Sequence, residues 1–189
     1  MYLRNKFFLI LLFIISCQPV EILKPIEIDY SQLETIYINA KEVKINVKYV
    51  STFTEQNIED QIKSPPIKII RNWIDRNVKI FGNQNKLIIN ILEASISKKE
   101  IENLDANKYE EKTIFQYEIF YLAEYELFDD NDYLLANTTV EVSRSTTSKK
   151  YISLNEKEII TNDLMFSSIL DFANESKTMI KTYMSEYLN

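Results

Sequence analysis

The strongest constraint on the fold is the stretch 112–128, which reads KTIFQYEIFYLAEYELF. It is dense in aromatic and β-branched residues, which favour β-strands. Its odd positions from Phe115 to Leu127 are uniformly apolar. Because side chains along a strand point alternately to opposite faces, one face of this strand should be buried against helices. The even positions mix acidic side chains with three apolar ones, Ile114, Phe120 and Leu122. The sequence therefore predicts a long strand with one buried face and one partly apolar open face.

Three further stretches show the pattern of strands. Residues 35–50 alternate apolar and polar side chains, residues 85–97 are strand-like, and residues 133–147 form the return strand of a hairpin with 112–128. The hairpin turn is the acidic cluster Asp129–Asp132. A calcium loop of the EF-hand type needs alternating ligands, a central glycine and a final glutamate, and this cluster lacks that spacing. We therefore expect a plain hairpin turn and no metal site.

An amphipathic helix is expected between the first two strands. Ser64 suits its N-cap position and Pro65 its first helical position, while Gly82 stands where a helix favours a left-handed C-cap residue. Trp73 lies beside the apolar stripe and is expected in the core or at its edge. The stripe recurs at spacings of three and four residues and consists of Ile67, Ile70, Ile74, Val78 and Phe81.

A second, longer helix is expected near the end of the chain, over residues 155–187. Ser153 or Asn155 can cap its start. Its apolar stripe thins near 174–177, so a kink or a break into two helices stays open.

These elements follow each other in the order β-α-β-β-β-α. We expect an α+β two-layer sandwich, in which a mainly antiparallel four-stranded sheet carries two helices on one face. The single domain should span residues 34–189. The other face of the sheet is either a surface that docks a partner or a lipid chain, or a face covered by the connections 51–63 and 98–111.

The first 17 residues have the pattern of a bacterial lipoprotein signal peptide. A positively charged start precedes an apolar run at 7–15, which is shorter than the roughly 20 residues that span a membrane. Residues 14–17 then look like a lipobox, so that cleavage between Ser16 and Cys17 would leave an acylated cysteine as the first mature residue. The expected organisation is a signal peptide over 1–16 and the lipidated Cys17 with its tether over 17–33.

The inventory of the chain excludes several classes of function. It contains no histidine, one glycine and one cysteine, which excludes histidine-based nucleophilic or zinc sites and glycine-rich phosphate loops. The net charge is −6, and loss of Arg4 and Lys6 with the signal peptide makes the mature chain more acidic. An acidic chain is a poor partner for nucleic acid. We expect no enzyme, no cofactor and no metal, and attachment to the membrane through the acyl chains alone.

Four features carry a resemblance when they are taken together. They are the lipobox at 14–17, the helix start Ser64-Pro65-Pro66 with Arg71-Asn72-Trp73, the hairpin end Val140–Ser145 and the long terminal helix. On these the chain resembles small Gram-negative envelope lipoproteins. It is similar in architecture to the auxiliary lipoproteins of ABC-type lipid-transport systems and, more weakly, to the lipoprotein that plugs the lipopolysaccharide-assembly barrel. The resemblance implies an accessory role in such a complex and offers no catalytic residues to transfer.

The leading hypothesis is therefore a non-enzymatic, lipid-anchored periplasmic lipoprotein. It would bind an envelope protein partner through the sheet face that carries Ile114, Phe120 and Leu122. Gln18 follows the cysteine in place of the aspartate associated with inner-membrane retention, which favours the outer membrane, facing the periplasm.

Two alternatives stay open. One is a structural or surface-exposed lipoprotein without a dedicated ligand. The other is a lipid or glycolipid carrier, with a cavity between helices and sheet lined by residues such as Phe166, Phe172, Tyr121 and Tyr125.

Overall fold

The expected long strand is present as β5, Thr113–Phe128, in a computed structural model that describes residues 28–52 and 54–188. The predicted signal peptide, Cys17 and the tether up to residue 27 lie outside the described residues. Along β5 every second side chain from Tyr117 to Leu127 is buried, and the side chains between them are half-buried. The alternation predicted from the sequence is confirmed.

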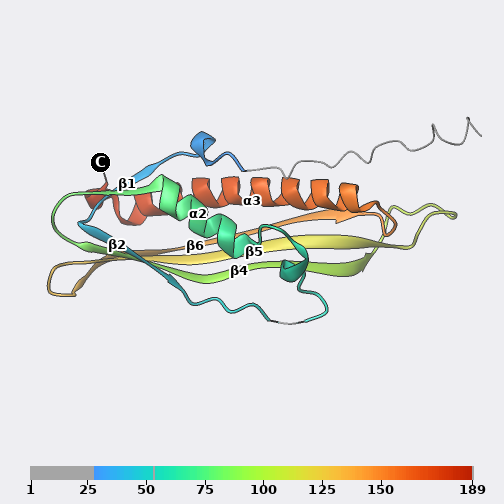
Figure 1. Cartoon of the computed structure of the whole chain (residues 1–189), viewed down its shortest axis with the longest axis horizontal. Coiled ribbons are helices and arrows are strands. Elements are labelled where there is room, and N and C mark those ends of the chain that lie inside the picture. Colours follow the sequence, from blue (N-terminus) through green and yellow to red (C-terminus); the bar gives the residue numbers. More distant parts are fainter. Residues whose placement is uncertain (1–27, 53, 189) are drawn as a thin grey trace, which may run out of the picture.

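The sheet and the helices form two layers (Figure 1). The four-stranded sheet has the order β2-β4-β5-β6; β4, β5 and β6 are antiparallel, and β2 runs parallel to β4. In the described part of the chain, α2 and α3 cover the same face of this sheet, as predicted. The principal elements are β1 (Ile36–Asn39), β2 (Glu42–Val47), α2 (Pro66–Asn77), β3 (Val78–Phe81), β4 (Lys86–Glu102), β5, β6 (Leu134–Ser148) and α3 (Leu154–Tyr183).

An aromatic contact joins the two helices to the sheet. The rings of Trp73 in α2 and Phe172 in α3 meet edge to face, with centroids 5.5 Å apart. Phe172 also contacts Tyr121 of β5 at a centroid distance of 5.5 Å. All three side chains are fully buried, and aromatic pairs in such arrangements add stability beyond the area that they bury. Trp73 is therefore a core residue, as the sequence analysis favoured.

The first helix is shorter than expected at both ends. Pro65 has an extended conformation (ψ 154°), which a residue before proline favours, so Pro65 rather than Ser64 occupies the N-cap position. At the other end the helix stops at Asn77, whose side-chain amide donates to the backbone carbonyls of Tyr30 (3.1 Å) and Leu33 (2.8 Å). This contact draws the segment before β1 against the helix end.

Residues beyond Asn77 form a strand that the sequence analysis missed. β3 pairs in parallel with β1 as a separate two-stranded sheet, with Ile36 opposite Val78 and Ile38 opposite Ile80. Val78 and Phe81 continue the helical stripe of α2. The four residues Val78–Phe81 are equally compatible with a strand, and their pairing with β1 favours the strand. Tyr30 and Leu33 are buried, so the core begins within the stretch expected to be tether.

Gly82 is correspondingly not a helix cap. It follows β3 with φ +105°, and a Cβ atom at this position would lie 2.1 Å from the side-chain oxygen of Asn39. Both the left-handed backbone and the close approach of β1 favour glycine here.

Two other boundaries differ from the expectation. The stretch 35–50 is divided between β1 and β2, because the chain passes from the small sheet to the edge of the large one after Asn39. β4 continues to Glu102, since its last residues pair with the start of β5 across the hairpin. α3 is continuous and has a capping box, in which the Ser153 hydroxyl accepts from the backbone N–H of Glu156 (3.2 Å) and the Glu156 carboxylate accepts from that of Ser153 (2.8 Å).

The conformation of Gly82 makes a specific prediction. Gly82→Ala should lower the free energy of unfolding by about 1–3 kcal/mol, because alanine is strained at this backbone angle and its methyl group meets Asn39. The measurement is urea unfolding followed by circular dichroism. The exposed neighbour Asn83 provides the control, and Asn83→Ala should change stability by no more than about 0.5 kcal/mol. Equal effects of the two substitutions would show that the turn does not require glycine.

Candidate functional site

The outer face of the sheet, on the side away from the helices, is open in the described part of the chain (Figure 1). Two connections, 51–63 and 98–111, could have covered this face. The loop between β4 and β5 extends past the ends of the strands and does not fold back over the sheet (Figure 1). Residues on both sides of position 53 follow the edge of β4, where backbone hydrogen bonds join Lys48 to Ile91 (2.9 Å) and Ile58 to Ile96 (3.2 Å). The outward side chains of β5 are half-buried rather than buried, so the surface predicted from the alternation is partly accessible.

Two of the three predicted contact residues lie together on this face. Phe120 and Leu122 are neighbours on β5 and are half-buried. Ile114 is also half-buried but lies six residues before Phe120, which is about 20 Å along a strand, and it faces Ile101 of β4. The structure thus separates Ile114 from the other two.

Acidic side chains surround Leu122. A register shift after Ile91 sets Glu93 of β4 opposite Leu122, and Glu141 of β6 lies opposite on the other side. Within the described residues none of the carboxylates around Leu122 forms an ion pair with a lysine or arginine. We call the following six residues the outer patch: Phe120, Leu122, Glu93, Glu124, Glu126 and Glu141.

One buried amide organises the acidic end of the outer patch. The side-chain nitrogen of Asn90, which is 2% exposed, donates to Glu124 (3.1 Å) and to Glu126 (2.7 Å). Its oxygen accepts from Asn46 of β2 (3.0 Å). The two carboxylates therefore point toward one neutral donor rather than a cation, and the patch keeps its negative charge.

The interior expected for a lipid carrier is filled by side chains. Phe172, Tyr121 and Tyr125 are fully buried, and the Tyr125 hydroxyl contacts the Ser176 hydroxyl at 3.2 Å. Burial raises the pKa of both tyrosines, so they stay neutral. These three residues form a packed core, and Phe166 is half-buried at its margin.

Two phenylalanines on α3 test this packing. Phe172→Ala should cost about 3–5 kcal/mol of unfolding free energy, as for other buried aromatic residues. Phe166→Ala should cost clearly less, because that ring is already half-exposed. Thermal and urea unfolding measure both. A small loss for Phe172→Ala, similar to that for Phe166→Ala, would indicate a loosely packed interior.

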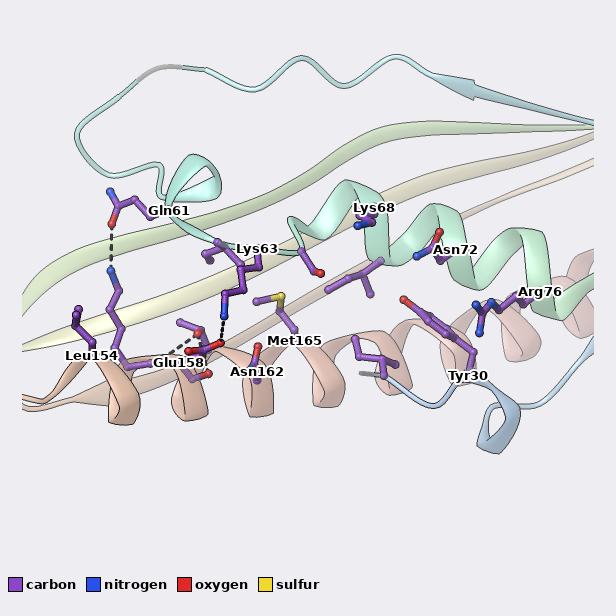
Figure 2. A pocket seen from close by; sticks show the side chains of 16 residues that line it. Tyr30, Gln61, Lys63, Lys68, Asn72, Arg76, Leu154, Glu158, Asn162 and Met165 are labelled. Carbon is purple, nitrogen blue, oxygen red and sulfur yellow. Dashed lines mark hydrogen bonds and ion pairs between the residues drawn. The ribbon is translucent and has the colours of Figure 1, made fainter. Parts of the chain in front are cut away.

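A groove between the two helices has no counterpart among the residues predicted from the sequence (Figure 2). Its volume is about 590 Å³. On α2 it is lined by Lys68, Asn72 and Arg76, which are spaced by four and so share one helix face. On α3 the lining comes from its first three turns, Leu154 to Met165.

The floor of the groove is apolar and its rim is cationic. Ile69 and Met165 are buried beneath it, each 2% exposed. Four cationic side chains line it, with a single carboxylate, Glu158. The cations are Lys63, Lys68, Arg76 and Lys157.

These cations differ in how far they are neutralised. Lys63 pairs with Glu158 at 3.0 Å, and the ammonium of Lys157 donates to the neutral side chain of Gln61 at 3.1 Å (Figure 2). Arg76 lies over the ring of Tyr30, 5.1 Å from its centroid. Neither Lys68 nor Arg76 has an ion-pair partner among residues 28–52 and 54–188. The nearby Asp29 carboxylate, whose pKa is lowered first by hydrogen bonds from Ser31 and also by the charge of Arg76, offsets part of the charge of Arg76. The groove can therefore accept an anion.

A second cluster of polar side chains lies at the edge of β4. The Tyr49 hydroxyl donates to the carboxylate of Glu59, which is buried and also accepts from the Asn57 amide at 3.2 Å. Burial and then the Glu59 carboxylate raise the pKa of Tyr49 to about 12. Tyr49 therefore stays protonated near neutral pH. The pair ties the segment after β2 to the segment before α2 and is unsuited to abstract protons.

The raised pKa of Tyr49 predicts a loss of stability in alkali. A tyrosine with an unfolded value of 10.0 and a folded value of about 12 contributes stability that is complete below about pH 10 and is lost as the pH rises toward 12. Urea unfolding at these two pH values should show a smaller alkaline loss for Tyr49→Phe than for the wild type. Tyr133→Phe, at a side chain that is 71% exposed, should behave as the wild type. The same loss in all three proteins would contradict the assignment.

No group of three or more histidine, cysteine, aspartate or glutamate side chains among the described residues could hold a metal ion. No helix in the described part of the chain is both long and apolar enough to cross a membrane.

Sequence reasoning could have found only part of the groove. The spacing of Lys68, Asn72 and Arg76 marks a polar helix face, which is the usual appearance of a solvated surface. The remaining lining comes from the segment around Ile28, from residues 61–64 and from α3. Their approach depends on the tertiary packing of the helices.

In comparisons with known proteins, the chain is similar to several solved structures. No family model matches the chain, and no curated protein matches it. A minor lipoprotein from Acinetobacter baumannii is 11% identical with a TM-score of 0.38, covering 72% of this chain and 87% of that one. The rare lipoprotein B from Shewanella oneidensis is 13% identical with a TM-score of 0.36, covering 73% and 94%. A neuraminyllactose-binding hemagglutinin homolog from Helicobacter pylori is 8% identical with a TM-score of 0.36, covering 82% and 93%.

Proposed function

We propose that this chain is a non-enzymatic, lipid-anchored protein of the bacterial cell envelope that holds a protein partner on the outer patch. It would act as an accessory subunit of an envelope transport or assembly complex. The anchor is Cys17, acylated after cleavage at Ser16–Cys17, and the location is the outer membrane, facing the periplasm. The observation that carries the proposal is the open, acidic outer face of a sheet whose other face is packed against helices.

The proposed anchor sets how far the domain can stand from the bilayer. Ile28, the first described residue, follows Cys17 by eleven positions. An extended chain spans at most about 3.3–3.6 Å per residue, so this tether reaches about 40 Å. The domain could then contact a membrane-embedded partner without leaving its anchor.

The chemistry of the outer patch indicates what kind of partner fits. Phe120 and Leu122 offer apolar contact area, and Glu93 and Glu141 flank Leu122 on the two neighbouring strands. A complementary protein surface would carry lysine or arginine side chains around an apolar centre. Such charge complementarity speeds association and excludes wrong partners.

In-cell photo-cross-linking tests this proposal. A photoreactive residue at Phe120 or at Leu122 should capture the same envelope protein, and the cross-linked peptide of that protein should carry lysine or arginine. A photoreactive residue at Leu170 on α3, which is 37% exposed on the helical side, should not capture it. The same protein captured equally from Leu170, or no protein from either sheet position, would contradict partner binding at the outer patch and leave a structural lipoprotein.

Charge reversal gives the matched control. The double variant Glu93→Lys with Glu141→Lys should lower capture about tenfold, because like charges now oppose the basic partner. Asp105→Lys with Asp163→Lys makes the same change in net charge at exposed positions outside the patch and should leave capture unchanged. Equal loss in the two double variants would show a general effect of charge rather than a docking site.

A further inference from the structure

We propose that the groove between α2 and α3 binds a membrane lipid through its anionic headgroup. This site is separate from the outer patch, since it lies on the helical side of the sheet (Figures 1 and 2). The membrane as the source of the ligand rests on the lipid anchor of the proposed function.

The charge of the groove is opposite to that of the protein. The chain carries 28 acidic and 22 basic residues, yet four of the five charged side chains that line the groove are cations. Lys68 and Arg76 share one face of α2 and lack ion-pair partners in the part of the chain that the structure describes. Lys157 reaches in from α3, where its ammonium donates to the neutral side chain of Gln61. An anion bound beside any one of these cations would form charge-assisted hydrogen bonds, which are the strong ones.

The apolar floor selects the class of anion. Ile69 and Met165 are buried under the groove, and Ile28 and Ile62 line it. Inorganic phosphate would use the cations but leave this surface exposed to water. A ligand with an anionic head and an apolar chain uses both. The volume of about 590 Å³ lies in the range of small-ligand pockets, roughly 300–1,000 Å³, so a headgroup and the first part of an acyl chain fit better than a folded protein surface.

The position of the groove favours a lipid over a soluble amphiphile. Ile28 lines the groove and is also where the tether from Cys17 joins the described domain. A tether that reaches about 40 Å keeps this opening close to the bilayer to which the acyl chains are attached. Membrane lipids are therefore the anionic amphiphiles at the highest local concentration.

Two adjacent residues on α3 allow a matched test in cells with the full chain. Asn162 lines the groove, whereas the next residue, Asp163, is exposed outside it. A photoreactive residue at Asn162 should yield adducts whose masses are those of anionic phospholipids, enriched above their share of the membrane. The same residue at Asp163 should give no such enrichment.

Removal of two cations tests the headgroup contact. Lys68→Gln with Arg76→Gln should lower the anionic-lipid adducts at Asn162 about tenfold or more, because the groove face of α2 then offers no charge-assisted contact to a headgroup. Arg71→Gln with Lys181→Gln removes equal charge from exposed positions on the two helices outside the groove and should leave the adducts unchanged. Circular dichroism of each purified variant verifies that it is folded.

Several results would overturn the inference. They are adducts that follow the lipid composition of the membrane without preference for anionic headgroups, a cross-link to residues 18–27 of the same chain, or capture of a protein at Asn162. The mass of the N-terminal peptide from the same cells reports acylation of Cys17. An acylated protein without anionic-lipid adducts refutes the groove and not the anchor. A protein without acyl chains that still gives these adducts refutes the anchor and not the groove.

Discussion

The contact of Trp73 with Phe172, and of Phe172 with Tyr121, holds the two layers of this protein together. It is the point where α2, α3 and β5 meet in the core. α2 is a short helix of 12 residues, whereas α3 has 30, and Trp73 is the largest side chain that α2 buries in the core. The groove lies between these two helices, and its shape depends on this contact.

A two-layer sandwich also determines what the other face of the sheet can do. α2 and α3 lie on one side (Figure 1), and the outward side chains of β5, among them Phe120 and Leu122, are only half-buried. The outer patch is acidic and the groove is cationic, and the sheet separates them. The proposed protein partner and the proposed lipid would thus contact opposite sides of the domain, and neither would have to displace the other.

The sequence predicted what depends on local periodicity and missed what depends on distant contacts. The alternation along β5 correctly placed Tyr121 and Tyr125 inside and Phe120 and Leu122 outside, because it spans 16 residues. Val78–Phe81 looked helical because its spacing continued the stripe, but Asn77 bonds to backbone atoms more than 40 positions earlier and β3 pairs with β1. The groove was missed for the same reason, since its cations come from segments far apart in the chain.

The most direct test of this account is the distance across the groove between spin labels at positions 68 and 162. Pulsed electron–electron double resonance measures this distance, with the labels in place of Lys68 and Asn162. Cys17 is the only cysteine of the chain, and its predicted acylation would leave the two introduced thiols as the only labelling sites. We predict one narrow distance distribution in the wild-type background and a broad one in Trp73→Leu, because loss of the aromatic contact frees α2 from α3. An equally narrow distribution in both would contradict the central role of this contact.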